Sequence, residues 1–233
     1  MVKERGGTSV ISLPTVQESP RVKAFLKQAD DNFIAIGYKE HGFRHANLAA
    51  NIARNVLKHL GYSDRESELA GIAGYLHDIG NAIGRNRHAQ SGAVLSLPIL
   101  TQMGMALEEV SQIIRAIGGH EEKEVDPDSA ITAAVILGDK TDVHFTRVRN
   151  LPGKSKLVST FTTHDRVNLA CERAFLNVDR DAGKISLELT IDTRICSVME
   201  YFEIFLSRVL FCQRAAKYLS HNFVLFINKV KFL

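Results

Sequence analysis

The chain has 233 residues, 45% of them hydrophobic and 24% charged, so it is long enough to bury one sizeable core or two smaller ones. A net charge of only +3 gives no reason to expect nucleic acid or a membrane as a partner. The three cysteines lack the spacing of a disulfide framework or a cysteine zinc site, which favours a reducing cytoplasm.

The N-terminal part begins without a continuous apolar run. Residues 1–19 are therefore expected to form a loosely ordered arm and not a signal peptide or an anchor. From residue 20 to about residue 37 the pattern predicts an amphipathic helix that packs over the core. The next helix, over about residues 44–60, has His45 at the start of its apolar stripe and ends before Gly61.

The stretch Tyr75–Gly80 places a histidine beside an aspartate at the end of the following helix. Ser63 and Glu66 have the spacing of a capping box that begins this helix. The apolar stripe continues to His77, so its imidazole points inward, and Asp78 lies about 100° round the helix from it. Burying a carboxylate is costly unless a cation or strong donors meet it. A partner for Asp78 is therefore required.

The next helices continue this pattern of polar groups on inward faces. A helix over about 88–102 has a histidine as its first residue, and a helix over about 106–117 is followed by two glycines and His120. The segment 126–128, Asp-Pro-Asp, is a good helix start. The helix that it begins carries Asp139 on its inward face.

Six polar side chains thus lie in line with, or next to, predicted apolar stripes. They are His45, His77, Asp78, His88, His120 and Asp139. A single such histidine is more often an ordinary core residue bonded to a carbonyl, but so many coincidences are much rarer. Imidazoles and carboxylates are the ligands of divalent metals, and the ion offsets the desolvation of the carboxylates. The set would serve two metals bridged by a carboxylate, or one metal with about four protein ligands.

This ordered pattern resembles the HD superfamily of metal-dependent phosphohydrolases, named for the paired His-Asp that residues 77–78 match. The four-ligand signature of the superfamily is matched by His45, His77, Asp78 and Asp139. The further histidines, His88 and His120, are similar to those of binuclear members, including the HD-GYP phosphodiesterases and the diiron dinucleoside tetraphosphate hydrolases.

The resemblance covers about residues 40–150 and has two departures. Many members have a lysine after His-Asp-Ile-Gly, whereas this chain has Asn81, so a phosphate-binding role for that lysine does not carry over. The Gly-Tyr-Pro stretch that names the HD-GYP group is absent after His120. We therefore do not predict a cyclic dinucleotide substrate.

The resemblance implies an enzyme that hydrolyses a phosphomonoester or phosphodiester bond of a small phosphorylated metabolite or nucleotide, by attack of metal-bound hydroxide. It implies one or two divalent ions, chosen from Mn, Fe, Mg, Co, Ni and Zn. Asp78 would bridge the ions, with His45, His77 and Asp139 on one and His88 and His120 on the other, and Asp78 and His77 would be the catalytic pair. Two alternatives stay open. They are a non-catalytic HD module that senses a ligand, and a structural helical protein with buried histidines.

Phosphate recognition also needs cations from the protein. The substrate-binding candidates, selected by position, are Arg85, Arg87, Arg147, Arg149 and Asp142. The competing interpretation is that these residues are simply solvated at helix ends. His41 and Glu121 are candidates for supporting the ligands from behind. Lys140 points about 100° away from Asp139 and is left out.

The expected fold class is mainly α, with an HD helical bundle over residues 20–150 and a smaller C-terminal α+β region over residues 151–233. In that region we predict a short helix over 163–174, a hairpin of strands 174–178 and 184–191, a long helix over about 193–219 and a last strand over 223–230. The hairpin must lean on the long helix, the last strand or a partner chain. The region would serve as a lid, a second small domain or the surface of a homo-oligomer.

Overall fold

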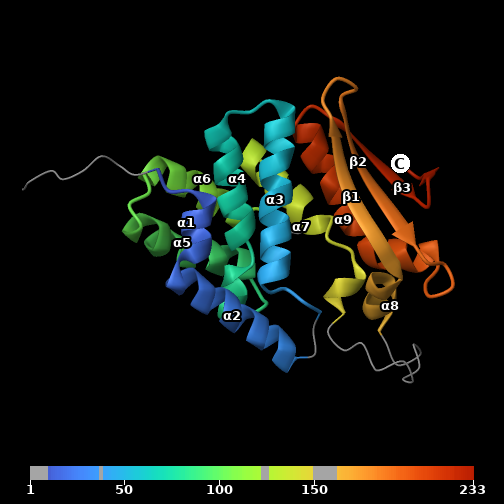
Figure 1. Cartoon of the computed structure of the whole chain (residues 1–233), viewed down its shortest axis with the longest axis horizontal. Coiled ribbons are helices and arrows are strands. Elements are labelled where there is room, and N and C mark those ends of the chain that lie inside the picture. The colour runs from blue at the N-terminus through green and yellow to red at the C-terminus, as the bar shows by residue number, and fades with distance from the viewer. Residues whose placement is uncertain (1–9, 37–38, 122–125, 149–161) are drawn as a thin grey trace, which may run out of the picture.

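The computed structural model describes residues 10–36, 39–121, 126–148 and 162–233. Figure 1 shows the N-terminal helices gathered into a bundle, beside a small sheet and a long helix formed by the C-terminal region. The helices of the bundle are α1 (Leu13–Glu18), α2 (Pro20–Ala35), α3 (Phe43–Leu60), α4 (Asp64–Leu76), α5 (His88–Gln102), α6 (Leu107–Gly118) and α7 (Ala130–Lys140), with 3-10 turns η1 (Ile79–Ala82) and η2 (Phe145–Arg147). The predicted mainly α class with an α+β appendage is confirmed.

Helix α3 lies between α4 and α7, and two glycines allow the close approach. A Cβ atom at Gly138 of α7 would lie 2.5 Å from the carbonyl oxygen of Ala49, and one at Gly74 of α4 would lie 2.9 Å from that oxygen. Only a residue without a side chain fits at these distances. The three helices that carry His45, His77 and Asp139 are therefore held backbone to backbone.

The C-terminal region is a four-stranded sheet with one crossover helix. It comprises α8 (Thr163–Ala170), β1 (Cys171–Asp179), β2 (Lys184–Ile191), α9 (Val198–Tyr218), β3 (Asn222–Ile227) and β4 (Val230–Lys231). The strands lie in the order β1-β2-β3-β4, in which β1 and β2 are antiparallel, β2 and β3 parallel, and β3 and β4 antiparallel. The predicted hairpin of β1 and β2 therefore pairs with β3. Helix α9 is the crossover that lets β3 run parallel to β2.

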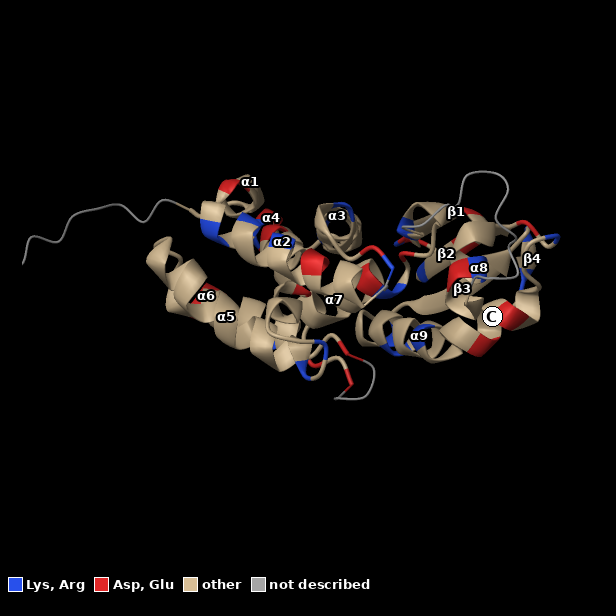
Figure 2. Cartoon of the chain, turned by 90° about the horizontal axis from the view of Figure 1, so that it is seen from below, with Lys and Arg blue, Asp and Glu red and all other residues tan. Residues whose placement is uncertain are grey.

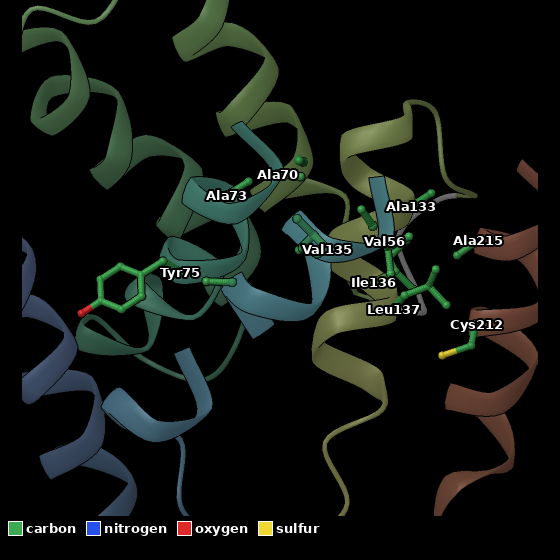
Figure 3. Packing of buried hydrophobic residues seen from close by; sticks show 14 of the residues in the cluster. Val56, Ala70, Ala73, Tyr75, Ala133, Val135, Ile136, Leu137, Cys212 and Ala215 are labelled. Atoms are coloured by element: carbon green, nitrogen blue, oxygen red, sulfur yellow. The ribbon is translucent and has the colours of Figure 1, made fainter. Parts of the chain in front are cut away.

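The bundle and the C-terminal region share one hydrophobic cluster. Figure 2 shows α9 beside α7, with the strands of the sheet above α9 in this view. In Figure 3, Ile136 and Leu137 of α7 lie beside Val56 of α3, toward Ala215 and Cys212 of α9. Helix α7, which carries Asp139, is therefore fixed from both sides. Within the described ranges, no helix combines the length and apolar character needed to cross a membrane.

Several sequence expectations differ from the structure. The long helix expected from about residue 193 begins at Val198, and the strand expected over 223–230 is divided into β3 and β4, because Asn228 and Lys229 between them have positive φ. Residues 13–18, expected in the loose arm, form α1, because Leu13 and Val16 reach the core and are buried there. Helix α7 begins at Ala130 and not at residues 126–128, because the Ser129 hydroxyl accepts the hydrogen bond that caps it. Helix α8 ends at Ala170, earlier than expected, because the following residues join the sheet as part of β1.

Candidate metal centre

The six predicted ligands converge at one end of the bundle. Each lies in the end turn of a helix or within two residues of a helix end. His45 lies in the first turn of α3, His77 and Asp78 directly follow α4, His88 begins α5, His120 follows α6, and Asp139 lies in the last turn of α7. All four histidines and Asp78 are buried. Among the described residues, every group of three or more side chains that could hold a metal ion is drawn from these six.

The four imidazole rings present the same nitrogen to the centre. Each Nδ1 lies within hydrogen-bond distance of an oxygen, so it must carry the proton and donate. The Nδ1 partners are Asp142 Oδ2 at 2.7 Å for His45, the Gly74 carbonyl at 2.8 Å for His77, the Arg85 carbonyl at 3.1 Å for His88, and the Ile117 carbonyl at 2.6 Å for His120. The Nε2 atoms are thereby left as the inward-facing ligand atoms, as in metal-binding histidines.

One group of ligand atoms surrounds a common point between α3, α4 and α7. The Nε2 atoms of His45 and His77 are 3.2 Å apart. Asp78 Oδ2 lies 3.6 Å and 3.4 Å from these two nitrogens, and Asp139 Oδ1 lies 3.3 Å and 3.6 Å from them. Ligands bound about 2.0–2.1 Å from a single ion are about 3.0–3.4 Å from one another. The spacing and the donor types therefore fit a divalent ion.

A second group lies on the other side of Asp78. Its Oδ1 atom is 3.2 Å from His88 Nε2, which is itself 3.2 Å from His120 Nε2. Glu121 Oε1 completes the group at 3.3 Å from His88 Nε2 and 3.8 Å from His120 Nε2. The two oxygens of Asp78 thus face two different ligand groups, which is the arrangement of a carboxylate that bridges two ions.

Without an ion, protons and a lysine balance the negative charge of the cluster. Burial opposes protonation of His77, but the charges of Asp78 and Asp139 raise its pKa to about 10. Burial likewise opposes protonation of His88, and hydrogen bonds to Asp78 and Glu121 raise its pKa to about 9. The pKa of Asp78 is held well below its ordinary value, since its interactions with His77 and His88 outweigh burial. Divalent ions can therefore replace protons that these imidazoles carry.

His120 behaves differently from the other rings of its group. Burial, together with the charges of His77 and Lys140, lowers the pKa of His120 to about 3. The ring is therefore neutral near pH 7, with its Nε2 lone pair directed at His88.

Polar contacts behind the ligands hold Asp78 and His45 in place. Asn81 donates from Nδ2 to Asp78 Oδ1 at 2.8 Å and to the Asp78 carbonyl at 3.0 Å. The Arg44 guanidinium donates to Asp142 Oδ2 at 2.8 Å, and that same carboxylate orients His45. Asn81, at the position where many family members have lysine, therefore orients the carboxylate that faces both groups.

The predicted substrate-binding residues are divided by the structure. Arg85 and Arg87 have exposed side chains in the turn before α5. Arg147, in contrast, is 1% exposed and donates to the carbonyls of Glu40 and Asp142, so it supports the backbone and does not face a substrate. Asp142 also differs from the expectation, because it is buried behind His45 and paired with arginines. The predicted Arg149 lies outside the described residues.

Sequence reasoning omitted Lys140 and gave Glu121 only a supporting position. The Lys140 ammonium lies 2.7 Å from Asp139 Oδ2 and 3.3 Å from Glu121 Oε1, and it is buried. Neighbouring residues of a helix point about 100° apart. Lys140 ends α7, however, and its long side chain turns back so that its ammonium reaches the Asp139 carboxylate. His41, the other supporting candidate, stacks on Phe33 with ring centroids 4.4 Å apart and is buried.

A sequence model of the HD domain matches residues 38–144. This segment is an HD domain, and it makes up a little under half of the chain. All six candidate ligands of its HD domain lie within the matched residues. The chain is also similar to the uncharacterized protein MJ1020 of Methanocaldococcus jannaschii, with 29% identity over 151 residues. That alignment covers 54% of this chain and 57% of the relative, so the chain spans little more than half the length of that protein.

Proposed function

We propose that this HD-domain protein is a metal-dependent phosphohydrolase that cleaves a phosphomonoester or phosphodiester bond of a small phosphorylated metabolite or nucleotide. The observation that carries the proposal is the placement of Asp78, whose two oxygens face two separate ligand groups. Membership of the HD family supports the reaction class. A metal-binding sensor without activity would need no such paired arrangement.

In this proposal, His45, His77 and Asp139 hold one divalent ion, His88 and His120 hold a second, and Asp78 contacts both. Bound there, the ions would act as Lewis acids toward the phosphoryl oxygens and lower the pKa of water toward about 7. The chain's own residues keep the ligands oriented. Asp142 and three backbone carbonyls fix the four imidazoles, and Lys140 neutralises the outer oxygen of Asp139.

The surface beside the second ligand group has room for the remainder of a small substrate. A cavity of about 440 Å³ is lined by Phe33, Ile36, Ile83 and Arg85, together with Asn81 and other residues of α2 and η1. Arg85 joins this cavity to the second ligand group, because its carbonyl accepts the hydrogen bond from His88 Nδ1. We infer that Arg85 and the neighbouring exposed Arg87 contact phosphate, while the apolar wall contacts the organic part.

The test is turnover of p-nitrophenyl phosphate and bis-p-nitrophenyl phosphate with added manganese. Wild type should hydrolyse at least one of them, and Asp78→Asn should lose about a thousandfold or more in kcat because it no longer joins the two ligand groups. The control is Asp179→Asn at the end of β1, where the Asp179 carboxylate accepts a hydrogen bond from Ala182 N of the hairpin turn. Bound metal without hydrolysis in a broad phosphoester panel would reject an enzyme and favour the sensor alternative.

A further inference from the structure

Three basic side chains from distant parts of the sequence surround one aromatic ring outside the metal centre. The Lys39 ammonium lies 5.4 Å from the ring centroid of Phe205, and the Arg208 guanidinium lies 4.8 Å from the same centroid. The His164 ring centroid is 6.4 Å from the same ring. Lys39 precedes α3, whereas His164 lies on α8 and Arg208 on α9, so the group forms where the HD bundle meets the C-terminal region.

Lys39 is buried without a counter-charge. Lys39 is 7% exposed, and its Nζ atom has no hydrogen-bond partner among the described residues. Burial, followed by the charges of Arg208 and Arg147, lowers the pKa of Lys39 well below its ordinary value. An isolated buried ammonium is costly, and nearby positive charges increase that cost. The fold therefore keeps a lysine where burial and the neighbouring positive charges outweigh the attraction of the nearest acids.

The acids that act on this group are engaged elsewhere. Asp139 and Asp142 both raise the pKa of Lys39, but Asp139 pairs with Lys140 and Asp142 pairs with Arg44 and His45. Asp165, the acid nearest His164 in the sequence, caps α8 at Thr162. Within the described parts of the chain, these carboxylates leave the charge of Lys39 uncompensated.

His164 supplies the second unpartnered polar group. Its Nδ1 atom is buried and has no hydrogen-bond partner. Burial, together with the charges of Lys39 and Arg208, lowers the pKa of His164 to about 4. The ring is therefore neutral near pH 7 and able to donate one hydrogen bond. Lys39, Arg208 and His164 act on one another electrostatically and all lie near the Phe205 ring. An ammonium, a guanidinium and a neutral donor gathered in this way are groups that bind phosphate.

We propose that Lys39, His164 and Arg208 form an anion-binding site that receives a phosphate group, separate from the metal centre. The site is near that centre, because His41 links the two. His41 Nδ1 donates to the Lys39 carbonyl at 2.9 Å, and the His41 ring centroid is 5.3 Å from that of the candidate ligand His45. The phosphate belongs either to the far end of a substrate with two anionic groups or to a separate small ligand.

The site is tested on metal-free protein, in which the ligand cluster binds no ion, by thermal unfolding with inorganic phosphate at constant ionic strength. Wild-type Tm should rise with phosphate concentration. Lys39→Met should have a higher Tm than wild type without phosphate, and its phosphate affinity should be about tenfold or more weaker. Lys39→Arg should retain the response. The control is Arg173→Gln, since Arg173 also lies over a ring, 5.5 Å from Phe175, but on the distant strand β1.

Equal phosphate responses of wild type and Lys39→Met would overturn the site, as would a wild-type Tm that does not respond to phosphate. The source of the phosphate is then read from KM values of metal-loaded protein. If Lys39→Met raises KM for a nucleoside diphosphate but not for p-nitrophenyl phosphate, the site holds the substrate's second phosphate. If both KM values are unchanged while the Tm response is lost, the site holds a separate ligand. The Tm measurement needs no hydrolysis, so it stands even if the proposed activity fails.

Discussion

Replacing Gly138 by alanine tests whether the close packing of α3 and α7 positions the metal ligands. The added Cβ would lie 2.5 Å from the carbonyl oxygen of Ala49, whereas ordinary contacts begin at 3.4 Å. Because that oxygen belongs to the backbone of a packed helix, α7 must retreat by up to about 0.9 Å, the difference between these distances. Asp139, the next residue, moves with it.

The expected effect on stability is the difference of two opposing contributions. Overpacking of this kind destabilises by about 1–3 kcal/mol. Alanine has a better helix propensity than glycine by about 1 kcal/mol. The net loss in the free energy of unfolding should therefore be about 0–2 kcal/mol. Metal binding should suffer more, because ligand distances tolerate changes of only about 0.2 Å, and we expect at least a tenfold weaker affinity.

The assay is urea unfolding of metal-free protein, followed by manganese titration of the folded protein. The matched control is Gly118→Ala, because Gly118 also lies in a helix, α6, but its Cβ would meet only Ala93 Cβ at 3.9 Å. The control should be as stable as wild type or slightly more stable, with unchanged metal affinity. If both variants behave alike in the two measurements, the close approach does not position the site.

Three further predictions concern the ligands and their supports. At pH 7 His77 and His88 are protonated, since their pKa values are about 10 and 9. Metal binding should therefore release protons, and the metal affinity should increase as pH rises toward 9. Calorimetry in buffers of different ionisation enthalpy measures the proton release, and binding without it would contradict the prediction. Asp142→Asn should weaken metal affinity about 10–100-fold by loosening His45, whereas Asp179→Asn should not, and equal affinities would exclude the supporting role. Asn81→Ala removes the donor to Asp78 Oδ1. It should lower the affinity for the second manganese ion about tenfold more than the affinity for the first. An equal loss of affinity for both ions would contradict the assignment.

The sequence predicted the convergence of the ligands because that depends on local periodicity. His45, His77 and Asp139 each continue an apolar stripe, and a stripe must face the core of a bundle. The capping box at Ser63 also appears in the structure as the start of α4. These are local signals, and tertiary packing did not change them.

Features that depend on contacts between distant residues were not predictable in the same way. The Lys140 ammonium approaches Glu121 across two elements, and no spacing along the chain indicates such a contact. Arg147 is likewise predicted from its position to contact phosphate, with solvation as the alternative, but the structure buries it against the Glu40 carbonyl before α3. The parallel pairing of β2 with β3 requires a crossover through α9, whereas the alternating pattern identifies only the strands.

The central claim is that Asp78 joins two metal sites, and metal content per chain tests it most directly. Protein loaded with manganese and freed of excess should be analysed by inductively coupled plasma mass spectrometry for wild type, Asp78→Ala and His120→Ala. We predict two ions per chain for wild type, none for Asp78→Ala and one for His120→Ala. Equal metal content in all three proteins would contradict the account.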